Sequence, residues 1–262
     1  MGDFIDEPIT LSSHALDALK EFYSERDVHT EKFEQLKADA GEDPDSKQAP
    51  LSMAAFREDW QESQFWCLAQ YHKGRASTVE DPGGIYAEDY SDETARLLAG
   101  QLLKSATEDT TIAVVSAPSV FVALKNLLNE AEAGSPKPKL ILLEHDQRFS
   151  VFPEFVFYDY NQPTKLPDTL KGSVDCIIID PPFLNPDCQT KMALTARWLS
   201  KPNTEDMRAI LVTGERMESL VLKLYKNFGL RTTTFDVVHM GLKNEFYCYA
   251  NFVDDAWKWK ES

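Results

Sequence analysis

Short apolar runs alternate with segments of helical periodicity from about residue 90 onward. Five runs predict buried strands, because parallel strands that are covered on both faces are apolar at nearly every position. These runs are residues 111–115, 140–144, 155–160, 174–179 and 209–213. Between them, apolar residues recur three or four positions apart, which predicts helices over residues 91–102, 119–128, 186–199 and 215–228.

The last two strand-like runs, residues 231–238 and 245–252, follow each other with too few residues between them for a helix. They therefore predict an antiparallel hairpin. The whole order predicts an α/β fold, namely a seven-stranded, doubly wound sheet with an antiparallel last strand.

The first 60 residues have a different pattern and predict an N-terminal helical arm and linker, ahead of one domain over residues 61–262. Ser12 or Ser13 is a suitable N-cap for a helix with one apolar stripe, formed by Leu16, Leu19, Phe22 and Tyr23. Residues 41–50 are polar and rich in helix breakers, as in a flexible linker. The arm is expected either to be a solvated helix that packs on its own domain or frays, or to dock a partner.

The charge balance narrows the possible partners. The 262 residues include 43 Asp and Glu against 27 Lys and Arg, a formal charge of -16. Such a surface repels phosphate backbones and favours basic partners, which argues against a nucleic-acid enzyme. No N-terminal apolar segment and no apolar run of about 18 residues is present, so neither secretion nor membrane spanning is expected.

Cysteine and histidine placement gives no sign of a metal site. The four cysteines, at positions 67, 176, 188 and 248, form no CxxC pair, and the five histidines show no ligand spacing. Buried free thiols suit a reducing compartment, so we expect a cytoplasmic protein without a metal.

The most informative motif follows the fourth predicted strand and consists of Asp180, Pro181, Pro182 and Phe183. Two prolines end the strand abruptly, at the sheet edge where α/β proteins bind ligands. The Asp180 carboxylate and the Pro181 carbonyl can accept hydrogen bonds from an amine and direct its lone pair, and the Phe183 ring offers a face to a base or a cation. This arrangement is typical of N-methyltransferases that use S-adenosylmethionine.

A nucleotide-type cofactor also needs an acid after the second strand, to accept hydrogen bonds from ribose hydroxyls. Glu144 stands there. The turn after the first strand lacks glycine but has small residues that permit close approach, and Ser119 is a suitable cap for the following helix; the turn consists of Ser116, Ala117, Pro118 and Ser119. After the third strand, Asp159 is placed to accept the adenine amino group, and Tyr160 to cover the adenine face.

Together these motifs resemble the translation elongation factor 1-alpha lysine N-methyltransferases, a family of the DPPF/DPPY type formerly described as N6-adenine DNA methyltransferases. The resemblance also rests on Gln64, Phe65 and Trp66, on residues 90–95 (Tyr-Ser-Asp-Glu-Thr-Ala) and on residues 244–249 (Asn-Glu-Phe-Tyr-Cys-Tyr). It implies a Rossmann-like class I methyltransferase that uses S-adenosylmethionine to methylate one lysine of the cytoplasmic elongation factor. It places Glu144 at the ribose, Asp159 near the adenine and residues 180–183 at the amine. We also expect residues 64–66 to line the substrate channel, and the enzyme to be a monomer.

Two other function classes remain open from the residues alone. The same tetrapeptide serves N6-adenine methylation of DNA or RNA, which the charge of -16 disfavours. The glycine-free turn would also suit a binding module that has kept the fold without the cofactor.

One segment departs from the family pattern. In the family, the Gln-Phe-Trp motif runs almost directly into the Tyr-Ser-x-Glu-Thr-Ala helix, whereas here residues 67–89 intervene. This segment has little periodicity and contains Asp81-Pro82-Gly83-Gly84. It is either a lineage-specific loop or a translated intron, and we favour the intron; uninterrupted transcript reads across codons 66 to 90 would contradict it.

Overall fold

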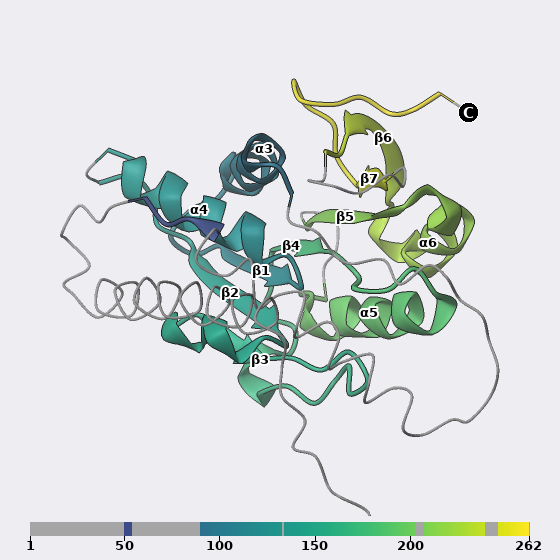
Figure 1. Ribbon diagram of the computed structural model, residues 1–262, viewed down its shortest axis with the longest axis horizontal. Coiled ribbons are helices and arrows are strands. Elements are labelled where there is room, and N and C mark those ends of the chain that lie inside the picture. The colour runs from purple at the N-terminus through teal and green to yellow at the C-terminus, as the bar shows by residue number, and fades with distance from the viewer. Residues whose placement is uncertain (1–49, 54–89, 133, 203–206, 239–245, 262) are drawn as a thin grey trace, which may run out of the picture. The chain divides into compact units, whose positions relative to one another are not determined.

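The computed structural model describes residues 50–53, 90–132, 134–202, 207–238 and 246–261 (Figure 1). The chain divides into two compact units, residues 1–46 and 47–262, and every described residue belongs to the second. The predicted arm helix, the motif at residues 64–66 and the segment 67–89 lie outside the described residues. The predicted domain boundary at residue 61 therefore stays a prediction.

Seven strands form one sheet in the order β3-β2-β1-β4-β5-β7-β6. Their bounds are β1 Thr111–Val115, β2 Lys139–Glu144, β3 Phe155–Phe157, β4 Cys176–Ile179, β5 Arg208–Gly214, β6 Arg231–Asp236 and β7 Phe246–Ala250. The first five are parallel to one another, and β7 runs antiparallel between β5 and β6. The predicted fold class is confirmed, and the strand order reverses direction beside β1, between β2 and β4.

Helices cover both faces of this sheet. Helices α3 (Asp92–Leu103) and α4 (Pro118–Glu130) lie on one side, and α5 (Pro186–Leu199) lies on the other with α6 (Glu218–Leu224) beside it (Figure 1). Successive strand residues point to opposite faces, so each central strand supplies both layers and is apolar throughout. The burial of β1 and β4 follows this rule, since Ile112 to Val115 and all of β4 are at most 5% exposed.

Side-chain caps begin two of the helices. Ser91 caps α3 by accepting a hydrogen bond from Thr94 N, and Asn185 caps α5 by accepting one from Cys188 N, with Pro186 at the first helical position. The predicted Ser119 cap is wrong. Helix α4 begins one residue earlier at Pro118, with Ala117 as N-cap, so Ser119 lies buried within the first turn.

The third strand and the predicted helix over residues 215–228 differ from their predicted bounds in ways that have a clear local cause. The third strand ends at Phe157 rather than at residue 160, because the Asp159 carboxylate accepts a hydrogen bond from Asn161 N at 2.8 Å and forms a turn. The predicted helix over residues 215–228 is divided into a 3-10 turn, the short α6 and a second 3-10 turn that ends at Gly229, whose φ of +69° suits a helix stop.

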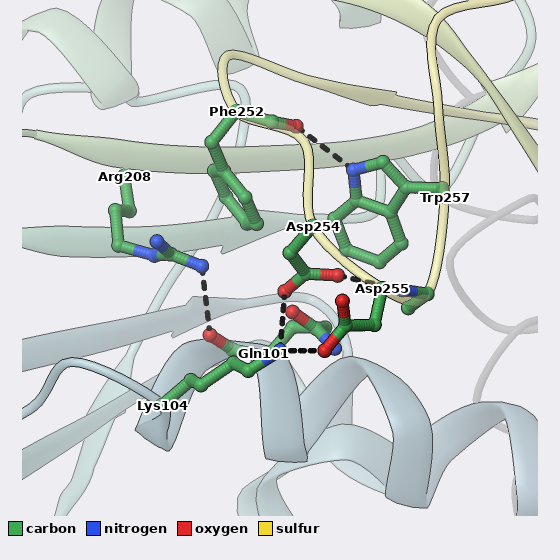
Figure 2. Close-up of polar contacts among 8 residues, drawn as sticks. Gln101, Lys104, Arg208, Phe252, Asp254, Asp255 and Trp257 are labelled. Atoms are coloured by element: carbon green, nitrogen blue, oxygen red, sulfur yellow. Dashed lines mark hydrogen bonds and ion pairs between the residues drawn. The ribbon is translucent and has the colours of Figure 1, made fainter.

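The residues after β7 pack against the end of α3 and the start of β5. This is the edge of the sheet opposite the carboxyl ends of the parallel strands. Lys104, just after α3, forms ion pairs with Asp254 at 3.2 Å and Asp255 at 3.5 Å, and Arg208 at the start of β5 donates to the Gln101 carbonyl at 3.3 Å (Figure 2). These contacts surround the beginning of β5. This polar cluster therefore stabilises the fold and takes no part in the site described next.

Candidate active site

The exits of the three central parallel strands are joined by backbone hydrogen bonds. Asp180 N, after β4, donates to Val115 O at the end of β1 (3.0 Å), and Ser116 N donates to Leu143 O in β2 (2.9 Å). This edge holds the carboxyl ends of the strands at the point where the sheet order reverses, which is the usual ligand position in open α/β sheets. The structure thus brings the predicted amine motif and the predicted cofactor turn together.

Asp180 is held by a residue far away in the sequence. The hydroxyl of Tyr90, which is 3% exposed, donates to Asp180 Oδ2 at 2.6 Å. Burial raises the pKa of Asp180 to about 7, although the hydrogen bond from Tyr90 lowers it. A carboxyl group with this pKa changes charge near neutral pH, which is unusual for an aspartate and typical of functional sites.

The turn after Asp180 presents aromatic surface. Pro181 is buried and Pro182 is partly exposed. The Phe183 ring lies 5.5 Å from the ring of Tyr160, measured between centroids, with the planes at 56°. Such a tilted pair is a common aromatic geometry. Tyr160 therefore lies beside the amine motif, although its sequence position suggested only an adenine contact.

Glu144 ends β2 as a buried acid, 4% exposed. Its Oε1 accepts hydrogen bonds from His145 N at 2.6 Å and Asp146 N at 3.1 Å, whereas Oε2 is buried without a hydrogen-bond partner among the described residues. Burial raises the pKa of Glu144 to about 7 against these two bonds, and the charges of Asp146 and Asp180 add to the rise. A buried acceptor without a donor is costly, so Oε2 suits a bound group that brings hydroxyl donors.

The glycine-free turn after β1 contains one residue with a strained backbone conformation. Ser116 has φ of +54°, the left-handed region that residues other than glycine seldom adopt. Ala117 and Pro118 are both buried, so the chain passes directly from the strand into α4. Backbone strain of this kind is found most often at ligand sites. All four predicted turn residues, 116–119, lie at the strand-exit edge.

The Asp159 carboxylate stabilises the turn that follows β3. Its two carboxylate oxygens accept from Asn161 N at 2.8 Å and from the Gln162 side chain at 3.1 Å, and this holds the turn after β3. An adenine contact for Asp159 stays a prediction.

Phe157 is an exposed aromatic side chain at this edge that the sequence analysis missed. It is 46% exposed, is paired with Glu144 in the sheet register, and lies 5.3 Å from the His145 ring.

Tyr90 and Phe157 are two site residues that the sequence analysis did not single out. Tyr90 belongs to the family motif at residues 90–95, but nothing local in the sequence indicates its contact with Asp180. Phe157 could have been found from strand alternation, since Val156 and Tyr158 point to the opposite face. Gln64, Phe65 and Trp66 lie outside the described residues, so their predicted place in the substrate channel stays a prediction.

Among the described residues, no group of three or more His, Cys, Asp or Glu side chains could hold a metal ion. Within the same ranges, no helix is both long enough and apolar enough to cross a membrane.

Comparison with known proteins assigns the chain to a family. Residues 89–254 match the family model described as "Probable N6-adenine methyltransferase". The chain is 42% identical to Protein-lysine N-methyltransferase EFM5 of Saccharomyces cerevisiae, over 95% of this chain and 94% of that protein. It is 36% identical to EEF1A lysine methyltransferase 1 of Gallus gallus, over 96% and 98%. The chain belongs to this family. It is an S-adenosylmethionine-dependent protein-lysine N-methyltransferase.

Other family members and solved structures complete the comparison. EEF1A lysine methyltransferase 1 of Homo sapiens is 34% identical, over 94% of each chain. A TehB-like SAM-dependent methyltransferase from Corynebacterium glutamicum has a TM-score of 0.40 and 16% identity, covering 76% of this chain and 99% of that one. The structural likeness is low, so the family assignment rests on the sequence relatives.

Proposed function

We propose that this methyltransferase acts on a lysine of translation elongation factor 1-alpha. Relatives whose names specify that factor align over almost their whole length, which supports a shared substrate. The charge of -16 suits a protein substrate that presents a basic surface around its target lysine. Since this substrate is a translation factor, we infer a cytoplasmic location, and we propose that the enzyme acts as a monomer.

The observation that carries the proposed mechanism is the hydrogen-bonded Asp180 carboxylate at the exit of β4, joined through the backbone to the end of β1. Asp180 and the Pro181 carbonyl accept hydrogen bonds from the lysine amine and hold its lone pair in one direction. Phe183, with Tyr160 against it, forms the apolar wall along the lysine side chain. Gln64, Phe65 and Trp66 are proposed to complete the channel.

The amine must lose a proton before it can react. A partly apolar site lowers the pKa of a lysine because burial disfavours the charged form. The ionised Asp180 orients the neutral amine, and the proton released on methylation passes to water. Most of the rate acceleration then comes from holding the reacting atoms in line, which is the main requirement of a displacement reaction.

The residues at the carboxyl ends of β1, β2 and β4 fit S-adenosylmethionine. Glu144 offers the free acceptor Oε2 to ribose hydroxyls, and residues 116–119 allow close backbone approach. We propose that Asp159, Tyr160 and Asp180 line the rest of the cofactor site. S-adenosylmethionine supplies an electrophilic methyl group bonded to a positively charged sulfur.

The test is methyl transfer from radiolabelled S-adenosylmethionine to purified elongation factor 1-alpha, with the modified lysine located by mass spectrometry. We expect label in the factor, and loss of that label when the identified lysine is replaced by arginine. The Asp180→Ala enzyme is the negative control. Absence of label in the factor, with label in other proteins of a lysate, would contradict the proposed substrate.

N6-adenine methylation is the second candidate, because the family model carries that description and the Asp-Pro-Pro-Phe turn also suits an exocyclic amine. The same assay with adenine-containing oligonucleotides tests it. Label in the oligonucleotide, and none in the elongation factor, would favour this candidate.

A further inference from the structure

Tyr90 is buried and makes a specific contact with the proposed catalytic turn. It is 3% exposed, and its hydroxyl lies 2.6 Å from Asp180 Oδ2. Among the described residues, no side chain or backbone group donates to the other oxygen, Oδ1. The tyrosine therefore engages one oxygen of the carboxylate, and the other oxygen keeps its capacity to accept a hydrogen bond.

The backbone around Tyr90 is fixed from two directions. The next residue, Ser91, caps α3 and also donates its backbone N–H to Val238 O at 3.0 Å. Val238 N donates in return to Thr94 Oγ1 at 3.3 Å. The start of α3 is thus attached to the segment that follows β6. These bonds hold the Tyr90 side chain in place, so its hydroxyl is a preorganised donor.

We propose that Tyr90 is the positioning residue of the Asp180 carboxylate: by donating to Oδ2, it turns Oδ1 toward the substrate amine and stabilises the ionised form of the carboxylate. This inference rests on the proposed role of Asp180. It adds the residue that sets the orientation and charge of that group. Tyr90 does not itself touch the amine.

The groups around Asp180 support this division of roles. Burial, followed by the charge of Asp180, raises the pKa of Tyr90 well above its usual value, so the tyrosine stays a donor. Burial also raises the pKa of Cys188 on α5 and of Cys248 on β7 to about 12, so both thiols are neutral near pH 7. Among the described residues, Glu144 is an acid close enough to Asp180 for their like charges to oppose ionisation. The Tyr90 hydrogen bond favours the ionised form of Asp180.

The first test is the pH dependence of thermal unfolding, which requires no substrate. In Tyr90→Phe the ionised Asp180 loses its donor, so the difference in Tm from the wild type should widen as the pH rises from about 6 to 8.5. Tyr225→Phe is the matched control, because Tyr225 is a buried tyrosine whose hydroxyl has no partner among the described residues. Its difference in Tm should not depend on pH. In an Asp180→Asn background, Tyr90→Phe should lose its pH-dependent effect.

The second test is the pH profile of kcat/KM for methyl transfer to elongation factor 1-alpha. In Tyr90→Phe, loss of the donor should move the acidic limb of the profile to higher pH by about one unit. At pH values on that limb, kcat/KM should therefore fall about tenfold. The affinity for S-adenosylmethionine should stay within about threefold, because Tyr90 is assigned no cofactor contact. Site-specific 2,3-difluorotyrosine at position 90 keeps the shape and strengthens the donor, so the limb should move to lower pH.

The outcomes separate this inference from the proposed function. An unmoved acidic limb in both Tyr90 variants, together with a pH-independent difference in Tm, would overturn the role of Tyr90. Full activity of Asp180→Ala would overturn the role of Asp180 itself, and the unfolding experiment would still report whether Tyr90 and Asp180 interact. If Tyr90→Phe does not fold, the difluorotyrosine variant alone decides the question.

Discussion

The side-chain amide of Gln189 donates to Thr213 Oγ1 at 2.9 Å and to the Phe183 carbonyl at 3.3 Å. Gln189 is fully buried in α5, so the helix that follows the Asp-Pro-Pro-Phe turn also holds the end of that turn against β5. With the backbone bond from Asp180 to Val115, the turn is fixed at both ends. Such fixation is what a reaction that depends on alignment requires.

Asp180→Ala should abolish methyl transfer and leave cofactor binding almost unchanged. Without the carboxylate, the amine lacks an acceptor that directs its lone pair, and we expect kcat to fall by at least about 100-fold. Asp180→Asn keeps one carbonyl acceptor but does not titrate, so it should retain part of the activity with a flatter acidic limb. Steady-state kinetics and calorimetric titration with S-adenosylmethionine measure both effects.

Asp187→Ala is the matched control for this experiment. Asp187 is an exposed acid in the first turn of α5 and pairs with Lys191 at 2.6 Å. Surface ion pairs of this kind contribute little, about 0.5 kcal/mol, so its activity should be close to that of the wild type. An Asp180→Ala enzyme as active as Asp187→Ala would exclude the proposed orientation of the amine.

Glu144→Gln should weaken S-adenosylmethionine binding with little effect on the chemical step. The amide places a donor where Oε2 now offers an acceptor, and losing hydrogen bonds to a charged group costs about 1.5–3 kcal/mol, or roughly 10–100-fold in Kd. In the wild type the pKa of Glu144 is about 7, so binding should tighten as the pH rises from 6 to 8. The variant should lack this pH dependence.

The exposed Asp168 provides the control for the change of charge, and Asp168→Asn should bind the cofactor as the wild type does. Calorimetric titration at several pH values measures each Kd. Equal affinities of Glu144→Gln and Asp168→Asn for the cofactor would show that Glu144 does not contact it.

Protein stability without cofactor should fall as the pH rises through neutrality. The folded pKa of Glu144 is about 7, above its ordinary value of 4.5, so the folded state binds a proton that the unfolded state releases. The stabilisation is therefore complete below pH 4.5 and is lost as the pH rises past 7, by at most about 3 kcal/mol. Asp180, with a raised pKa of about 7, acts in the same direction.

Urea unfolding between pH 5 and 8.5 measures this effect. The double variant Glu144→Gln, Asp180→Asn should show a much smaller change in the free energy of unfolding than the wild type over this range. A wild-type curve parallel to that of the double variant would mean that neither carboxyl group has a raised pKa.

The sequence predicts the sheet well because burial on both faces is a local property of each strand. It also locates Glu144 and Asp180, because a polar residue at the end of an apolar run marks a strand exit. It does not predict the partners of these acids. Tyr90 reaches Asp180 across 90 positions, and Gln189 reaches Thr213 across 24, and neither contact has a local signal. The early end of β3 depends on one side-chain bond, that of Asp159, which competes with the strand.

Gly214 and Gly100 should respond in opposite ways to alanine. A Cβ at Gly214, which ends β5, would lie 2.7 Å from Leu184 Cδ1 and 3.1 Å from Cδ2, so Leu184 must move. Leu184 directly follows Phe183, and its movement should misplace that ring. We expect Gly214→Ala to lose about 1–2 kcal/mol of stability and to lower kcat, whereas the cofactor Kd changes little.

Gly100 lies within α3, and an added Cβ there meets nothing within 4 Å. Gly100→Ala should therefore raise stability by up to about 1 kcal/mol through helix propensity, without a change in activity. Thermal unfolding and steady-state kinetics of both variants test the pair. A Gly214→Ala enzyme with normal kcat would show that the Phe183 ring tolerates displacement, and the apolar wall would then be less important than the hydrogen bonds to Asp180 and Pro181.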